Sequence, residues 1–169
     1  GWQLIVLGGN HDSVATLNES RELLAQLNAQ VISGVRELLE EQVLVLRNRR
    51  GEPGAILCAV PFIRPRDVLL SQAGQSGTEK QQALQQAIAD HYAALYRQAL
   101  TLREQLGQAL PIIATGHLTT VGASTSESVR DIYIGTLDAF PASAFPPADY
   151  IALGHIHRAQ RIAGTEHIR

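Results

Sequence analysis

Tyr150-Ile151-Ala152-Leu153-Gly154-His155-Ile156-His157 is the stretch that most constrains the fold. Its first four residues form an apolar run typical of a buried strand, and a glycine with two histidines follows. If the strand continued through the histidines, alternation would place both imidazoles on the same side. Imidazole is the side chain that most often binds metals, so the stretch predicts a metal-binding strand end.

Two other segments have the same organisation. The apolar run at residues 4–7 leads into Gly9-Asn10-His11-Asp12, and the run at 112–115 leads into Gly116-His117. In open α/β sheets, ligands bind beyond the carboxyl ends of the strands. We therefore expect all three segments to deliver their polar side chains to one common edge.

The donor atoms in these segments suggest which ion they could bind. Asn10 offers an amide oxygen, and His117, His155 and His157 offer imidazole nitrogens. This mixed set suits Mn, Fe, Co or Zn better than Ca or Mg. His11 could donate a proton or a hydrogen bond to a phosphate or leaving oxygen. Asp12 could orient His11 or cap a following helix, a role that Ser13 could equally fill.

Composition indicates an ordinary globular domain. The chain has 169 residues, of which 45% are hydrophobic and 18% charged, which predicts a single domain with a sizeable core. No apolar run approaches the length of a membrane span. The lone Cys58 lies in an apolar run and is expected to be buried, which fits a reducing cytoplasm. A net charge of −2 argues against a strongly basic nucleic-acid binder, although bound cations could supply positive charge to a nuclease.

The remaining pattern alternates strands with helices. Helices are predicted at about 13–28 and 79–106, the second one ending at Gly107, and a hairpin is predicted from strands 43–46 and 55–60. Short strands are also expected at 31–33, 131–134 and 158–163, and a loop at 62–66. Because the runs at 4–7, 112–114 and 150–153 are apolar throughout, the expected fold is an α/β sheet covered on both faces.

The three motifs, in this order, resemble those of the calcineurin-like metallophosphoesterases. The longer segments Pro61-Phe62-Ile63-Arg64-Pro65-Arg66-Asp67 and Thr115-Gly116-His117-Leu118-Thr119 are similar to the bacterial SbcD nucleases within that superfamily, and the similarity covers nearly the whole chain. The resemblance implies a four-layer α/β/β/α sandwich, present here as one partial nuclease domain truncated at both ends.

The resemblance also implies roles for individual residues. Asn10, His117 and His155 match ligands of one Mn²⁺ of a dinuclear site, His157 matches a ligand of the other, and His11 matches the catalytic histidine. Asp12 completes the signature without being a usual ligand. Mg²⁺ or another divalent ion could replace Mn²⁺. The implied partners are an SbcC-type ATPase subunit, DNA ends and hairpins, and a second copy of the chain in a homodimer; no membrane is implied.

The family's first two motifs, Asp-x-His and Gly-Asp-x-x-Asp, do not occur in this sequence. They would supply an Asp and a His to the first metal and the Asp that bridges both. The ligands that remain are neutral, so nothing balances two divalent charges. We therefore expect this polypeptide by itself to bind metal weakly and to be inactive, as a fragment of a longer protein.

Simpler explanations exist for several of these residues. His155 and His157 could be ordinary strand histidines, and Asn10 only a turn residue. Arg64 and Arg66 could contact a DNA backbone, but a solvated loop with salt bridges is the more ordinary role. The leading functional hypothesis is a metal-dependent DNA exonuclease and endonuclease subunit acting in repair and recombination. The alternatives are a general phosphoesterase for small substrates and a non-catalytic scaffold or dimerisation fragment.

Overall fold

The computed structural model describes residues 2–69, 76–122 and 139–169. Its strands form three sheets. A four-stranded sheet has the order β3-β4-β5-β8, a two-stranded parallel sheet joins β1 to β2, and a short parallel pair joins β6 to β7. The strands are β1 (Leu4–Leu7), β2 (Ala29–Ile32), β3 (Val43–Arg47), β4 (Pro53–Cys58), β5 (Ile112–His117), β6 (Thr120–Val121), β7 (Phe140–Pro141) and β8 (Tyr150–Gly154).

The four-stranded sheet contains the expected hairpin. β3 and β4 pair antiparallel, whereas β4, β5 and β8 are mutually parallel neighbours. The side chain of Asn48 closes the hairpin turn by accepting from the N–H groups of Arg50 and Glu52 at 2.8 and 3.1 Å. The parallel strands run in the same direction, so β4, β5 and β8 bring their carboxyl ends to one edge. The sequence predicted this for β5 and β8, whereas β1, the third predicted strand, lies in the separate two-stranded sheet.

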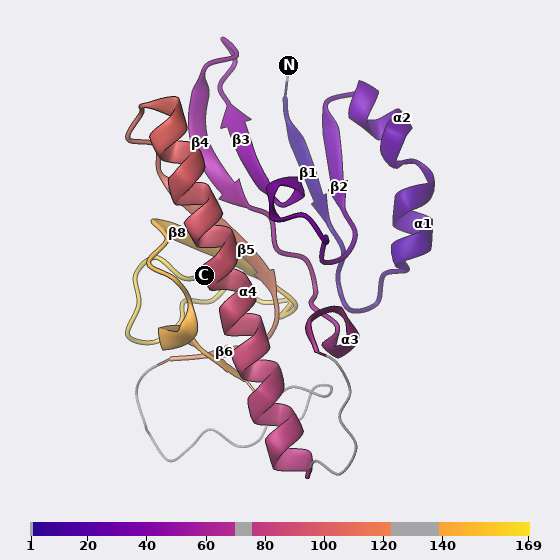
Figure 1. Cartoon of the computed structure of the whole chain (residues 1–169), viewed down its shortest axis with the longest axis vertical. Coiled ribbons are helices and arrows are strands. Elements are labelled where there is room, and N and C mark those ends of the chain that lie inside the picture. The colour runs from indigo at the N-terminus through magenta and orange to yellow at the C-terminus, as the bar shows by residue number, and fades with distance from the viewer. Residues whose placement is uncertain (1, 70–75, 123–138) are drawn as a thin grey trace.

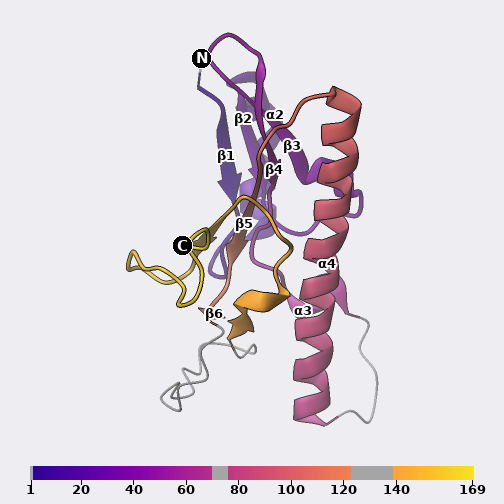
Figure 2. The same ribbon diagram turned by 90° about the vertical axis from the view of Figure 1, so that its left-hand side faces the viewer.

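The helices are α1 (Val14–Glu19), α2 (Arg21–Gln26), α3 (Pro65–Val68) and α4 (Gly77–Leu106), with 3₁₀ turns at Leu39–Glu41 and Ala142–Ala144. Figure 1 shows α4 running along the molecule across β5 and β8, and Figure 2 shows it on one side of the strands. Within the part of the chain that the structure describes, no helix is long and apolar enough to span a bilayer.

α4 has the limits that its end signals predict. Ser76 and Glu79 form a capping box, in which Ser76 Oγ accepts from the Glu79 N–H and the Glu79 carboxylate accepts from the Ser76 N–H. Gly107 ends the helix in the left-handed conformation, with φ 62°. The face between these ends packs on the sheet. Its apolar residues recur at spacings of three or four, and most are buried, namely Leu84, Ile88, Tyr92, Leu95 and Ala99, whereas Leu102 of the same series is only partly buried.

Two apolar layers flank the four-stranded sheet. On the α4 side, the core includes Ile56, Cys58, Ile112, Ala114 and Ile151, so Cys58 is the buried thiol expected. On the opposite side, a smaller cluster joins the alternate residues of β3, β4 and β5 to β1 and β2: Ile5, Leu7, Ile32, Leu44, Leu46, Leu57, Ala59 and Ile113. The α/β class is therefore confirmed, and the four-layer sandwich stays a prediction for the complete domain.

Several expectations about local structure were wrong. The helix expected at 13–28 is divided at Ser20 into α1 and α2, neither of which buries any residue fully, and Leu23 and Leu27 of its apolar stripe are 68% and 71% exposed. Short helices depend on tertiary burial for their stability, and this stripe has little. β1 is likewise not covered on both faces, because Leu4 is 57% exposed.

The carboxyl end also differs from expectation. Residues 158–163 form no strand; instead the Ile162 N–H donates to Ile168 O, and Ile168 bridges to Ile151 of β8. Ile168 therefore occupies the edge of β8 with which a strand at 158–163 would have to pair.

The loop expected at 62–66 is a loop as far as Arg64, and α3 begins at Pro65. The strand predicted at 131–134 lies outside the described residues.

Tyr92 connects α4 to the strand end that carries His117. Its buried hydroxyl donates to the Thr115 carbonyl at 2.8 Å, and a Cβ added to Gly116 would overlap that hydroxyl and Leu118. We expect Gly116→Ala to destabilise the protein by about 1–3 kcal/mol and Tyr92→Phe by about 1–2 kcal/mol. In the double variant the alanine should cost less than in the wild type, because the hydroxyl is gone.

Urea unfolding of the four proteins of this cycle measures the coupling. Gly77→Ala is the control, because a Cβ there would meet nothing within 4 Å. An equal cost of alanine at residue 116 with and without the Tyr92 hydroxyl would contradict this packing.

Candidate metal and phosphoester site

Asn10 and His117 meet at the edge where the strands end. Asn10 lies in the turn after β1, and His117 is the last residue of β5. The His117 Nε2–H donates to Asn10 Oδ1 over 2.9 Å, across 107 residues of sequence. An amide oxygen can only accept, so this bond fixes the tautomer that protonates Nε2. Two of the three predicted segments therefore converge on one point.

His155 brings the third segment to the same place. Its ring centroid lies 5.2 Å from that of His117, with the planes inclined by 61°. β8 ends at Gly154, and His155 has φ 95°, an uncommon conformation for a residue with a side chain. The prediction that His155 and His157 leave a strand on the same side was thus wrong, because both lie beyond the strand.

Glycines permit this close approach. A Cβ added to Gly9 would lie 2.8 Å from His117 Cε1, and one added to Gly154 would lie 3.2 Å from His117 Nδ1. A side chain at either position would push the His117 ring away from its partners. These glycines keep the space around His117 open, in addition to making tight turns.

The other candidate residues have different surroundings. His11 is exposed in the same turn as Asn10. Asp12 neither caps α1 nor orients His11: its carboxylate accepts from the Gly9 N–H at 2.7 Å, and Ser13 caps α1 by accepting from the Thr16 N–H at 3.3 Å. Asp12 therefore closes the turn that presents Asn10 and His11.

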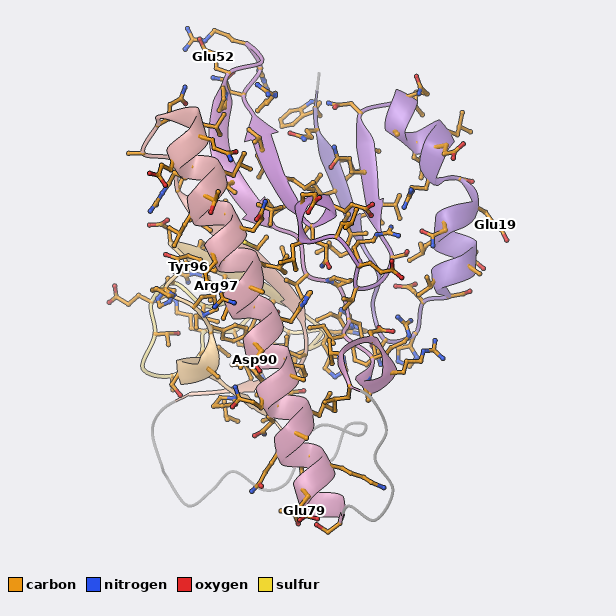
Figure 3. The ribbon with its side chains drawn as sticks, in the orientation of Figure 1. Glu19, Glu52, Glu79, Asp90, Tyr96 and Arg97 are labelled. Atoms are coloured by element: carbon orange, nitrogen blue, oxygen red, sulfur yellow. The ribbon has the colours of Figure 1, made fainter. Side chains whose placement is uncertain are left out.

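His157 lines a cavity of about 900 Å³, together with Leu118, Ile156, Arg158, Arg161 and Arg169. Its charge also contributes to lowering the pKa of His117, less than that of His155 does, so His157 lies near the cluster. Within residues 2–69, 76–122 and 139–169, no three His, Cys, Asp or Glu side chains converge in a way that could hold a metal ion. Figure 3 shows Glu52 and Glu79 at opposite ends of the molecule, so these two carboxylates cannot share a site.

Two residues of the loop after β4 also lie at the site: Phe62, to which the sequence analysis gave no role, and Arg64, which it considered only as a DNA-backbone contact or a solvated loop residue. The Phe62 N–H donates to Gly8 O at 2.8 Å, and its ring meets the His117 ring edge-on at 6.1 Å between centroids. The Arg64 Nη2 donates to Asp12 O at 2.9 Å. Their loop follows the carboxyl end of β4, at the same edge of the sheet. The rule that ligands bind beyond the carboxyl ends of strands, which identified the other three segments, could therefore have identified this loop as well.

The surroundings of His117 lower its pKa. Burial is the largest cause, the neighbouring His155 acts in the same direction, and Asp12 opposes them. The ring is therefore held neutral more readily than a free histidine, and a neutral imidazole is the form that binds a metal ion.

The donor geometry fits one divalent ion. Two ligands about 2.1 Å from an ion and at right angles to each other lie about 3 Å apart, close to the 2.9 Å between Asn10 Oδ1 and His117 Nε2. Two imidazoles on one ion place their ring centroids roughly 4.5–5.5 Å apart, a range that includes the His117–His155 separation. Asn10 and His117 thus fit two adjacent positions around an ion, provided that His117 moves its proton from Nε2, and the His155 ring is close enough to be a candidate for a third.

Comparison with known proteins finds relatives over the whole chain. It is 62% identical over 169 residues to a protein of Escherichia coli (strain K12) named as the SbcD subunit of the nuclease SbcCD. The whole of this sequence therefore corresponds to one part of an SbcD subunit. Proteins of the same name in Rhodobacter capsulatus and Staphylococcus saprophyticus are 32% and 36% identical over 170 and 154 residues, or 96% and 91% of this chain.

The chain spans about two fifths of the length of the relatives it matches: 41% of the E. coli protein, 40% of the R. capsulatus protein and 36% of the S. saprophyticus protein. No family model matches the sequence.

The surroundings of His117 lead to a prediction about its pKa. In metal-free protein its pKa should lie below the ordinary 6.5, and His155→Ala should raise it only part of the way, because burial remains. A folded-state pKa below the unfolded value means that the unfolded chain binds the proton more readily. Protonation of His117 therefore favours unfolding. The protein keeps its full stability above about pH 6.5, where the ring is neutral in both states, and loses stability as the pH falls below that value.

An NMR titration of the imidazole resonances in chelator-treated protein measures both values. A His117 pKa at or above 6.5, or no change on replacing His155, would show that the ring environment differs from this one.

Proposed function

We propose that this chain forms part of a metal-dependent phosphodiesterase centre that cleaves DNA, in a subunit of an SbcCD-type nuclease. The single observation that carries the proposal is the meeting of Asn10 Oδ1 with His117 Nε2, with the His155 ring beside them. The family relationship supports DNA as the substrate class, since the relatives are named as nuclease subunits.

In this proposal, Asn10, His117 and His155 hold one divalent ion, with Mn²⁺ as the favoured metal. When bound, such an ion polarises a phosphoryl oxygen and lowers the pKa of bound water. His157 stays a candidate ligand for a second ion, which would need further ligands from the rest of the subunit. The complete domain would be a four-layer α/β/β/α metallophosphoesterase sandwich.

His11 is the proposed catalytic histidine. It is exposed, so a substrate can reach it, and it is adjacent to Asn10 in a turn that Asp12 closes. From that position its imidazole can donate a hydrogen bond or a proton to an oxygen of the scissile phosphate. The partners in this proposal are an SbcC-type ATPase and DNA ends or hairpins. Homodimerisation and a cytoplasmic location stay predictions.

The role of His11 is tested in the complete subunit with its partner. His11→Ala should lower the rate of cleavage of linear duplex DNA by a factor of about 10²–10⁴ and leave Mn²⁺ affinity unchanged. His167→Ala is the matched control, because His167 is also exposed but lies in none of the three motifs. Cleavage at the wild-type rate by the His11 variant would rule out the assigned role.

The substrate class is tested with the same wild-type complex. A nuclease should prefer duplex DNA over bis-p-nitrophenyl phosphate in kcat/KM, whereas a general phosphoesterase should not. No cleavage of either substrate with Mn²⁺ present would favour a scaffold and refute the proposal.

The charge argument predicts how this chain behaves by itself. Asn10, His117 and His155 are neutral donors, so isothermal titration should show weak Mn²⁺ binding and no second tight site. Asn10→Ala should weaken the binding further. Tight binding of two ions per chain would contradict the argument.

A further inference from the structure

We propose that Arg64 is a positioning residue for the proposed nuclease reaction: its guanidinium holds the turn that carries Asn10 and His11 in place against Phe62 and His117. The inference rests on the proposed function. It concerns a residue that touches neither metal nor substrate.

The first support is the contact between Arg64 and the turn. Arg64 Nη2 donates to the backbone carbonyl of Asp12 at 2.9 Å, across 52 residues of sequence. Asp12, which carries that carbonyl, is the residue directly after His11. At the other end of the turn, the Gly9 N–H donates to the Asp12 carboxylate. The backbone around His11 is therefore held by two bonds within the turn, because the Asp12 N–H also donates to Gly9 O at 3.3 Å, and by one bond from Arg64.

The second support is the rigidity of the loop that carries Arg64. The Phe62 N–H donates to Gly8 O, the Arg64 N–H donates to the Asp67 carboxylate at 3.1 Å, and Pro65 begins α3. Arg64 is thus held between two backbone anchors. A guanidinium on a fixed backbone loses little conformational freedom when it binds, which makes it an effective clamp.

The third support is the link from Arg64 to His117. The guanidinium carbon lies 5.7 Å from the centroid of the Phe62 ring, which in turn meets His117 edge-on. Arg64 therefore connects the turn after β1 with the ring at the end of β5. A displacement of the guanidinium would release the Asp12 carbonyl and remove one side of the Phe62 packing.

Arg64 and Arg66 lie in the same loop but differ in exposure. Arg64 is half-buried: its Nη1 is buried with no partner among the described residues, and its Nη2 makes the bond to Asp12 near the surface. Nη1 is therefore closed to a DNA phosphate, and the salt dependence below tests whether the rest of the guanidinium contacts one. The Arg66 side chain is 80% exposed, and its ion pair with Asp67 is long, at 3.9 Å. Arg66 is therefore a matched control in the same loop.

The experiment uses the complete subunit with its ATPase partner and linear duplex DNA. Arg64→Gln and Arg64→Lys should each lower kcat at least tenfold, with KM for DNA changed by less than twofold. Lysine should not rescue the rate, because one ammonium group cannot both donate to the Asp12 carbonyl and keep the contact that the larger guanidinium makes with the Phe62 ring. Arg66→Gln should keep the wild-type kcat.

The dependence of DNA binding on salt provides a second readout, which a positioning residue should not change. If Arg64 contacted a phosphate, Arg64→Gln would reduce the slope of log K against log salt by about 0.9, and lysine would restore it. That result, or an unchanged kcat in both variants, would overturn the inference. Arg64→Lys keeps the charge and the aliphatic stem, and a melting temperature near that of the wild type confirms that it folds. A wild-type complex that does not cleave DNA would instead refute the proposed function.

Discussion

The contact between Asn10 and His117 is the constraint on which the site depends. Asn10 lies in the turn after β1 and His117 ends β5, a strand of the other sheet, so the 2.9 Å bond between their side chains links the two sheets at this edge. The apolar cluster of Ile5, Leu7 and Leu57 holds the two sheets together behind that bond. The core thus sets the positions of the strand ends, and the strand ends set the distance between the donor atoms.

The surrounding residues remove the other positions that the ring of His117 could take. The Tyr92 hydroxyl binds the Thr115 carbonyl and so fixes the backbone that leads to His117. The Phe62 ring contacts the His117 ring edge-on, and Gly9 and Gly154 leave the space that the His117 ring fills. Burial and the neighbouring His155 also favour a neutral imidazole, because both lower the pKa of His117. The same packing that fixes the geometry therefore favours the neutral imidazole that an ion requires, and only the proton on Nε2 must still be moved or released.

Sequence patterns correctly predicted those helices and strands whose apolar spacing and end residues match the face that is buried in the structure. For α4, the apolar periodicity and the terminal glycine were recognised in the sequence and agree with the structure, whereas the capping box at Ser76 and Glu79 was not recognised and the helix begins two residues earlier than predicted. The division at Ser20 and the turn at residues 162–165 were missed, because they depend on which partner occupies a strand edge or covers a stripe. The position of His157 relative to His117 could not be predicted either, since it depends on where β8 ends and on the φ of 95° at His155.

The convergence of the three strand ends is tested most directly by anomalous diffraction at the manganese edge, on crystals of the complete subunit soaked in Mn²⁺. The account predicts a peak within bonding distance of Asn10 Oδ1, His117 Nε2 and a ring nitrogen of His155. A peak bound elsewhere, with Asn10 and His117 separated or still hydrogen-bonded to each other, would contradict it.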